Sequence, residues 1–417
     1  MPTLSNYNLL DLFAIPNTYN LSEGTARYYS SLTPKWDVIK NLKTINFIVS
    51  FDNLPQGATE LAYHNSINTH LFKPKFFVLD NKHRNIYCMV PNIEVLAHTL
   101  RSLAVISYHL GNKNIKVSVQ EKNQKYSDYC KGWEIEDRVI LGWRDSFLKF
   151  LKVFWLLQNN IEQKYVEKLV QELENRLKEP DENVIDEISE ILYKEKGLRL
   201  SDFEKHFKIT YQNSSTPCIA GANLEINGVK ISIVQLTWGL TLSRQMMQSL
   251  LDLNPHIKKV GSVGGVGYGK ADELQLDDIF LPKGLIVPSK SGKLKAKPIT
   301  NHIFTVQENT YFKNKKVSTG NMKTVVPQIG VLSNTATFKD YTDLISGFDM
   351  ELEGFLDVLE KYPNIEYASS HYIMDIPFRG YSLGDTYYYK PYLEKFFKTF
   401  NRGKYYCFER ILNFAIA

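Results

Sequence analysis

A glycine-rich run is the first feature of this chain whose residue types suggest chemistry. Between two apolar segments the sequence reads Lys259-Val-Gly-Ser-Val-Gly-Gly-Val-Gly-Tyr-Gly269. Backbone that is cleared of side chains in this way can turn tightly and point N–H groups at an anion or a sugar. We therefore predict a strand, a glycine loop and a second strand, with the loop facing a ligand. A turn with a purely structural role is the alternative.

The spacing of these glycines argues against two common nucleotide-binding motifs. The run contains no G-x-G-x-x-G, and the polar stretch that follows does not open a helix, as a dinucleotide-binding motif requires. Gly269-Lys270 is followed by Ala271 rather than by Ser or Thr, so a P-loop is not indicated. The next apolar segment, 279–287, is predicted to be a strand.

Two stretches further along the chain add carboxylates to this picture. Residues 347–355 open a helical pattern that carries Asp349, Met350 and Glu351 and continues to Lys361. Residues 365–376 form an apolar, strand-like run that ends in the carboxylate Asp375.

Taken in order and spacing, these pieces resemble the nucleoside phosphorylase and nucleosidase superfamily over residues 217–415. That family includes purine nucleoside phosphorylase, uridine phosphorylase and methylthioadenosine/S-adenosylhomocysteine nucleosidase. Its members show a Gly-Ser/Thr-x-Gly loop, a Gly-Asp before an apolar strand, a Ser-x-x-x-Phe segment, a Met-Glu helix start and an Arg-x-x-Ser-Asp strand end. The counterparts in this chain are residues 261–265, 277–280, 333–338, 349–351 and 371–375.

The resemblance implies a reaction and assigns residues to it. Cleavage of an N-glycosidic bond passes through an oxocarbenium-like ribose, so the departing base needs a proton and the ribose hydroxyls must be held. By resemblance, Asp375 would protonate the base and Glu351 would bind the 2′- and 3′-hydroxyls. By resemblance, Met350 would form the apolar floor beneath the sugar, and Phe338 would stack on the base. Ser262, with the backbone of Gly261, Gly264 and Gly265, would form the site for the nucleophile.

The chain departs from the family pattern in two places. His371 and Met374 replace the Arg and Ser of the family's strand end; His371 can still be cationic near a carboxylate, and we expect it to contact the substrate. Lys259 stands where phosphorylases often carry Arg, and Lys binds phosphate only as a point charge. Water is therefore the predicted nucleophile. If phosphate is used instead, Lys259, Ser262 and Arg144 are its predicted contacts.

Each candidate also has a purely structural interpretation. Asp375 would cap a turn, Glu351 would be a first-turn acid favoured by the helix dipole, and His371 would be an ordinary buried histidine. The altered surroundings of His371 also leave open a second function, a module on the same fold that binds or senses a nucleoside without turnover.

Composition excludes several other classes of protein. With 417 residues, 43% apolar and 23% charged, the chain has the composition of a soluble globular protein. The formal net charge of +5 is small for this length and argues against a dedicated nucleic-acid binder. The four cysteines and nine histidines show no metal or redox spacing, so no cofactor or metal is predicted. Neither a secretion signal nor a membrane-spanning stretch is predicted, and a cytoplasmic enzyme is expected.

The chain divides into three predicted parts: an N-terminal α+β domain of unknown role at 1–135, a first core strand with a helical insertion at 136–205, and the nucleosidase-like core at 206–417. The N-terminal part contains a predicted hairpin at 75–90 and a helix from Ile93. Residues 138–148 read as a strand, a Gly142 turn and a helix, which places 160–200 as an insertion between the first two core strands. The alternative is that 1–200 form a separate domain and the core lacks its first strand.

The predicted fold class is therefore α/β: a mixed twisted sheet with helices on both faces, nucleoside phosphorylase-like, together with the N-terminal α+β domain and the helical insertion. The predicted partner is a nucleoside-like small molecule, with phosphate as a second one. No nucleic-acid or membrane partner is expected. The resemblance implies a homo-oligomer, because the family's sites are often completed by a neighbouring subunit.

Overall fold

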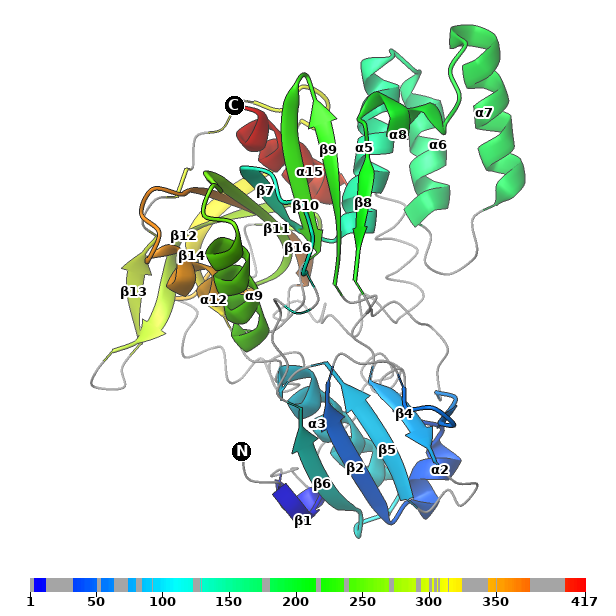
Figure 1. Cartoon of the computed structure of the whole chain (residues 1–417), viewed down its shortest axis with the longest axis vertical. Coiled ribbons are helices and arrows are strands. Elements are labelled where there is room, and N and C mark those ends of the chain that lie inside the picture. Colours follow the sequence, from blue (N-terminus) through cyan, green and yellow to red (C-terminus); the bar gives the residue numbers. More distant parts are fainter. Residues whose placement is uncertain are drawn as a thin grey trace.

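The computed structural model of the protein describes most of the chain in segments. The described residues are 4–12, 33–50, 54–63, 74–79, 85–91, 93–122, 128, 130–174, 181–214, 219–235, 240–269, 274–289, 294–299, 302–303, 306, 308–313, 315–324, 344–349, 351–375 and 402–417. Within them the chain forms two sheets, and Figure 1 shows the first sheet below the second.

The first sheet has six strands in the order β1-β6-β2-β5-β4-β3. Strand β2 is parallel to both β5 and β6, whereas β4 and β5 pair antiparallel, as the predicted hairpin requires. Alternate residues of β2 are buried because successive side chains of a strand point to opposite faces. Helices α2 and α3 contact each other, and their apolar side chains share a core with the strands. The elements are β1 (Leu4–Asn8), η1 (Leu10–Leu12), α2 (Trp36–Asn41), β2 (Thr44–Val49), β3 (Thr59–Glu60), β4 (Lys75–Val78), β5 (Asn85–Val90), α3 (Ile93–His109) and β6 (Lys116–Glu121).

The second sheet has ten strands of mixed direction, and we call it and its helices the core. Its strands are β7 (Arg138–Gly142), β8 (Thr210–Asn213), β9 (Ala220–Ile226), β10 (Val229–Gln235), β11 (Lys259–Tyr268), β12 (Ile279–Pro288), β13 (Leu294–Pro298), β14 (Val317–Thr324), β15 (Gly347–Asp349) and β16 (Glu366–Asp375). Its helices are α5 (Arg144–Gln158), α6 (Gln163–Glu174), α7 (Glu182–Lys196), α8 (Asp202–His206), α9 (Leu240–Leu253), α12 (Leu352–Leu359) and α15 (Arg402–Ile416).

Half of this sheet closes on itself. Strand β11 pairs with β16, β16 with β12, β12 with β14, β14 with β15, and β15 again with β11. These five strands therefore form a small closed barrel. From it β7, β10, β9 and β8 extend as an open sheet on one side, and β13 pairs with β12 on the other.

The glycine-rich run is one continuous strand, so the predicted strand–loop–strand is wrong. All ten residues of β11 are extended, and they pair in parallel with β16 from Lys259 opposite Glu366 to Gly267 opposite Asp375. The glycines give neighbouring side chains room instead of forming a turn. A Cβ on Gly261 would lie 2.5 Å from Cγ2 of Ile411 in α15. This close approach explains a glycine there without any ligand.

The segment predicted as the first core strand is a strand of the ten-stranded sheet. Strand β7 pairs in parallel with both β10 and β11, and α5 begins directly after it. Helices α6, α7 and α8 follow before the chain returns to the sheet at β8. Gly197, with φ of +66°, ends α7 in the left-handed conformation that glycine favours.

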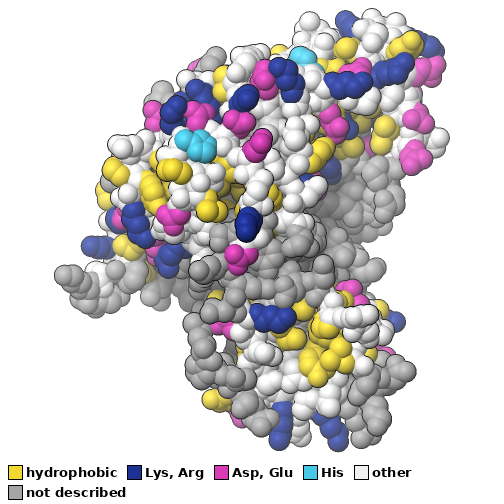
Figure 2. Space-filling view, viewed as in Figure 1, with side chains coloured by type: hydrophobic (Ala, Val, Ile, Leu, Met, Phe, Trp, Pro, Cys, Tyr) yellow, Lys and Arg dark blue, Asp and Glu magenta, His cyan; other side chains and the backbone are white. Residues whose placement is uncertain are grey.

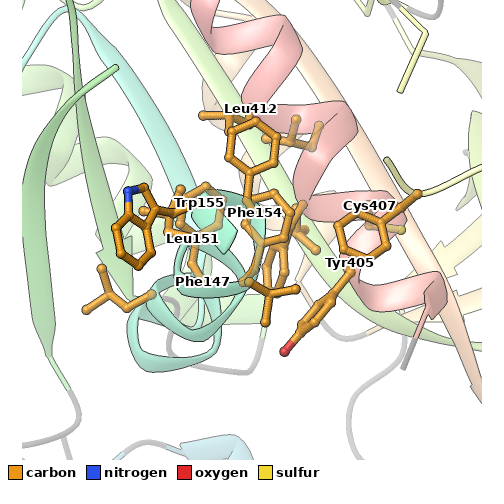
Figure 3. Close-up of a cluster of buried hydrophobic side chains, with 14 of the residues drawn as sticks. Phe147, Leu151, Phe154, Trp155, Tyr405, Cys407 and Leu412 are labelled. Carbon is orange, nitrogen blue, oxygen red and sulfur yellow. The ribbon is translucent and has the colours of Figure 1, made fainter. Parts of the chain in front are cut away.

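Helices cover both faces of the core sheet, as predicted. On β7, Val139 and Leu141 point to the face covered by α9 and α12, whereas Ile140 points to the face covered by α5 and α15. Figure 3 shows the second of these layers, where aromatic side chains of α5 meet α15. Phe147 and Phe408 pack edge to face with ring centroids 5.2 Å apart. Burial of one such ring contributes about 1.5–3 kcal/mol, so this layer anchors α15 on the sheet.

On the face in Figure 2, basic and acidic side chains are interspersed over the core. No helix in the described part of the chain is long and apolar enough to cross a membrane.

Candidate functional site

Four parallel strands of the core run toward the same edge of the sheet. Gln235 at the end of β10 lies opposite Gly142 at the end of β7, and β11 and β16 run in the same direction beside them. Ligands of open α/β sheets bind outside the carboxyl ends of parallel strands. We therefore take this edge, together with the start of α12, as the candidate site.

The strand register brings two of the predicted residues to one end of β11. Gly267 lies opposite Asp375 of the parallel strand β16 and opposite Phe348 of the antiparallel strand β15. Three residues after Phe348, Glu351 is the N-cap of α12. Two other predicted contacts, Met350 and Phe338, lie outside the described residues.

A carboxylate absent from the predicted contacts, Asp349, organises this helix start. Its Oδ2 accepts hydrogen bonds from the backbone N–H of Leu352 at 2.6 Å and of Glu351 at 3.2 Å. Its Oδ1 accepts one from Thr324 Oγ1 at 2.6 Å, and that hydroxyl accepts one from the Glu353 N–H at 2.9 Å. Burial raises the pKa of the Asp349 carboxyl above its ordinary value, and these hydrogen bonds oppose the rise. An acid just before an apolar helical pattern is the sequence signal for such a cap.

Ser262 lies inside the sheet. It pairs with Leu141 of β7 on one side and with Ser369 of β16 on the other, and the residue is 3% exposed. Its Oγ is 2.6 Å from the hydroxyl of Tyr367, with either atom able to donate. Burial raises the pKa of Tyr367 well above its ordinary value, so the phenol stays protonated. The hydroxyl predicted to hold a nucleophile is therefore occupied by a neighbouring side chain.

The glycines around Ser262 make room on both faces of β11. Gly264 faces His371, since an added Cβ would lie 3.3 Å from the imidazole Nδ1. Gly265 faces Met374 on the opposite side, where an added Cβ would overlap Sδ at 1.6 Å. His371 and Met374 therefore fill space that the glycines leave.

Burial favours the neutral form of His371 over the cationic form that the sequence allows. His371 is 4% exposed, and among the described residues neither ring nitrogen has a hydrogen-bond partner. Burial lowers the pKa of the imidazole from 6.5 to about 4, because the charged form is not solvated there. His302, which is partly buried nearby, hydrogen-bonds to Ser369 Oγ at 2.9 Å, and burial lowers its pKa to about 3.

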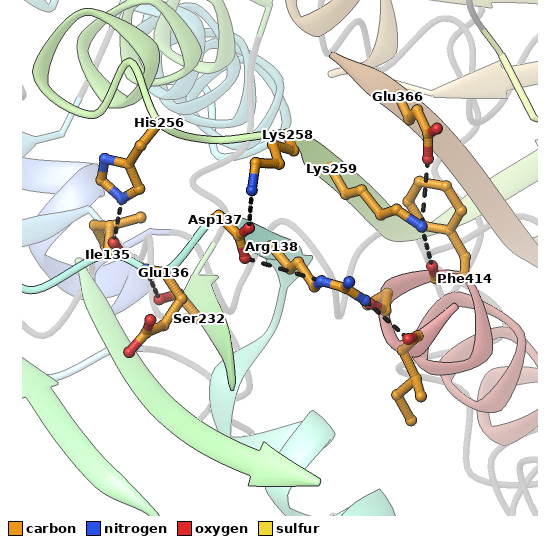
Figure 4. A network of polar contacts seen from close by, with 12 residues as sticks. Ile135, Glu136, Asp137, Arg138, Ser232, His256, Lys258, Lys259, Glu366 and Phe414 are labelled. Carbon is orange, nitrogen blue, oxygen red and sulfur yellow. Dashed lines mark hydrogen bonds and ion pairs between the residues drawn. The ribbon is translucent and has the colours of Figure 1, made fainter. Parts of the chain in front are cut away.

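The two basic residues predicted for phosphate lie at different ends of the sheet. Lys259 is at the start of β11, where its Nζ is 3.3 Å from Glu366 Oε2 and 3.5 Å from the Phe414 carbonyl oxygen. Figure 4 shows this side chain directed toward Glu366 and the end of α15. Eight strand residues at about 3.3 Å each, roughly 26 Å, separate it from the Asp375 end of the sheet. The structure therefore does not bring Lys259 and Asp375 together.

Arg144, in contrast, follows β7 at the candidate edge. Its Nε donates to Asp145 Oδ1 at 2.9 Å, and a terminal nitrogen donates to Asn213 Oδ1 at 2.9 Å. It also lies over the Tyr211 ring. No group of three or more His, Cys, Asp or Glu among the described residues is arranged to hold a metal ion.

Comparison with known proteins gives matches only among solved structures. No protein-family model and no curated protein matches the chain. The chain is similar to purine nucleoside phosphorylase from Toxoplasma gondii in complex with immucillin-H, at 11% identity and a TM-score of 0.42, over 71% of this chain and 98% of that one. A 5′-methylthioadenosine/S-adenosylhomocysteine nucleosidase from Colwellia psychrerythraea is 12% identical, with a TM-score of 0.36 over 51% of this chain and 90% of that one. AMP nucleosidase from Bacteroides thetaiotaomicron is 14% identical, with a TM-score of 0.34 over 67% of this chain and 93% of that one. Likeness at this level establishes neither membership of a family nor an activity.

Proposed function

We propose that this protein cleaves the N-glycosidic bond of a nucleoside or nucleoside-like substrate. One observation carries the proposal: the register at Gly267 places Asp375 and the helix start with Glu351 at the same end of one strand. In the proposed reaction Asp375 protonates the departing base, and Glu351 accepts hydrogen bonds from two ribose hydroxyls. A proton for the departing base and hydrogen bonds to the ribose hydroxyls both favour an oxocarbenium-like transition state.

Two features of the site support this division of roles. Asp349 and Thr324 bind backbone N–H groups at the start of α12, so the backbone that carries Glu351 is held before substrate arrives. Preorganised groups of this kind lower the free energy of a transition state without a reorganisation cost. A neutral His371 also fits a cationic sugar better than a charged one, because it adds no repulsion.

Water is the proposed nucleophile, with phosphate as the alternative. A phosphorylase must hold a dianion, which bidentate Arg does well. Lys259 is paired with Glu366 at the far end of β11, and Arg144 already donates to Asp145 and Asn213. Both arrangements favour hydrolysis.

The test is release of free base from adenosine, guanosine, inosine and uridine by the purified chain, with and without added phosphate. Hydrolysis predicts free ribose and a rate indifferent to phosphate. Asp375→Asn should lower the rate by about 10²–10⁴-fold, the usual contribution of a general acid. Asp186→Asn, the same change at an exposed position of α7, should leave it unchanged. Base release at the wild-type rate by a folded Asp375→Asn variant would show that another group is the acid.

A second function is favoured by the surroundings of Ser262. Its hydroxyl is buried and bonded to Tyr367, so the proposed nucleophile site has one polar group fewer than the sequence resemblance implies. A protein that binds a nucleoside without turnover fits this observation. Calorimetric binding of a nucleoside, with no base or sugar product in either buffer, would establish this alternative.

A further inference from the structure

Helix α3 of the N-terminal sheet is buried on more than one face. A helix that covers only a sheet buries a single apolar stripe. In α3 the apolar stripe of Leu96, Leu100 and Leu103 packs into the core of its own sheet. The polar residues His98, Thr99 and Ser102 are buried too, each 2% exposed or less. Helix α3 also contacts α9 of the ten-stranded core, so it lies between its own sheet and the core.

We call the six-stranded sheet with α2 and α3 the N-terminal domain. Two core residues at the candidate edge pack against the apolar cluster of this domain. Trp143 directly follows β7, and Met374 directly precedes Asp375 in β16. In Figure 1 the N-terminal domain lies below the core, on the side toward which the parallel strands end. The domain is therefore seated against the edge that carries the candidate site.

We propose that the N-terminal domain forms one wall of this site, so that a nucleoside bound at the ends of β7 and β16 lies between the two domains of a single chain. The inference rests on the proposed function and names what completes its site. Small-molecule sites occur preferentially at domain interfaces, where most of a ligand's surface can be covered. Met374 links the two parts directly, because it contacts Gly265 and the N-terminal domain and is the chain neighbour of the proposed acid.

Hydrogen exchange on the full chain tests the proposal, with adenosine, guanosine, inosine and uridine as probes. A nucleoside held between the domains should slow exchange in β16 and α12 and also in residues 95–107 of α3. Slower exchange in β16 and α12 alone would overturn the inference and leave the proposed function standing. No change anywhere with all four probes would overturn both.

A variant pair adds a kinetic test of the same wall. Trp143→Ala removes a contact between the domains, whereas Trp133→Ala removes an equally partly buried tryptophan that lies near Gly221 within the core. We expect Trp143→Ala to raise KM for the nucleoside about tenfold with a smaller fall in kcat, and Trp133→Ala to change neither, tenfold being about 1.4 kcal/mol. If Trp143→Ala does not fold, the milder Trp143→Phe takes its place. Its KM should lie above that of Trp133→Ala and rise by less than tenfold over the wild type. Equal KM values for the Trp143 and Trp133 variants would overturn the proposal.

Discussion

The buried, neutral His371 makes a prediction about acid stability. An unfolded chain takes up a proton near the ordinary imidazole pKa of 6.5, whereas burial holds the pKa of folded His371 at about 4. Because the folded pKa is depressed, the unfolded state binds more protons between these values, and stability falls as the pH falls from 6.5 toward 4. A shift of one pKa unit corresponds to about 1.36 kcal/mol, so the full loss of unfolding free energy is about 3 kcal/mol. The part of this loss that occurs by pH 5 is about 2 kcal/mol.

The perturbation is His371→Leu, which keeps a similar side-chain size and removes the titrating group. Between about pH 7.5 and about pH 5, we expect the free energy of unfolding to fall by about 2 kcal/mol less in the variant than in the wild type. At neutral pH it should be at least as stable as the wild type, because two ring nitrogens without described partners are replaced by apolar atoms. His302 remains in both proteins, so the difference reports on His371.

The assay is hydrogen exchange of β11 and β16 amides, corrected for intrinsic rates and expressed as opening free energies. Local opening is the appropriate measure because a chain with two sheets need not unfold in one step. His109→Leu is the matched control, because it is the same change at an exposed position at the end of α3. Its opening free energy should fall with pH as much as that of the wild type. A loss in His371→Leu as large as in the wild type would refute a buried, neutral imidazole at this position.

Three further predictions concern the sheet and the helix start. Glu351→Ala should weaken ribonucleosides more than 2′,3′-dideoxynucleosides, by about 1.5–3 kcal/mol for each lost charged hydrogen bond; equal losses in calorimetry would show that Glu351 does not touch the sugar. Gly261→Ala should lower stability in thermal unfolding by about 1–3 kcal/mol, because the new Cβ meets Ile411 at 2.5 Å. The Cβ added by Gly142→Ala lies 3.6 Å from a carbonyl oxygen and should have little effect on stability. Similar losses of stability in the Gly261 and Gly142 variants would contradict this packing. Asp349→Ala should speed hydrogen exchange at the start of α12, since a lost helix cap costs about 0.5–2 kcal/mol, and unchanged exchange there would exclude the capping role.

Local sequence patterns determined much of the secondary structure. The hairpin of β4 and β5, the start of α3 at Ile93 and the β7–α5 unit follow from apolar periodicity and turn residues within a few positions of each other. The end of α7 follows from Gly197 in the same way. These features depend on near neighbours in the chain, which a sequence shows directly.

The tertiary structure alone decided the conformation of the glycine run and the placement of the site residues. Glycines carry no side-chain pattern that separates a loop from a strand, and here Ile411 and Met374, far along the chain, account for their packing. The distance of Lys259 from the candidate edge depends on the register of β11 against β16, and the neutrality of His371 depends on burial by several elements. The seating of the N-terminal domain against Trp143 and Met374 left no sequence signal, because contacts between domains are made by residues whose spacing along the chain has no period.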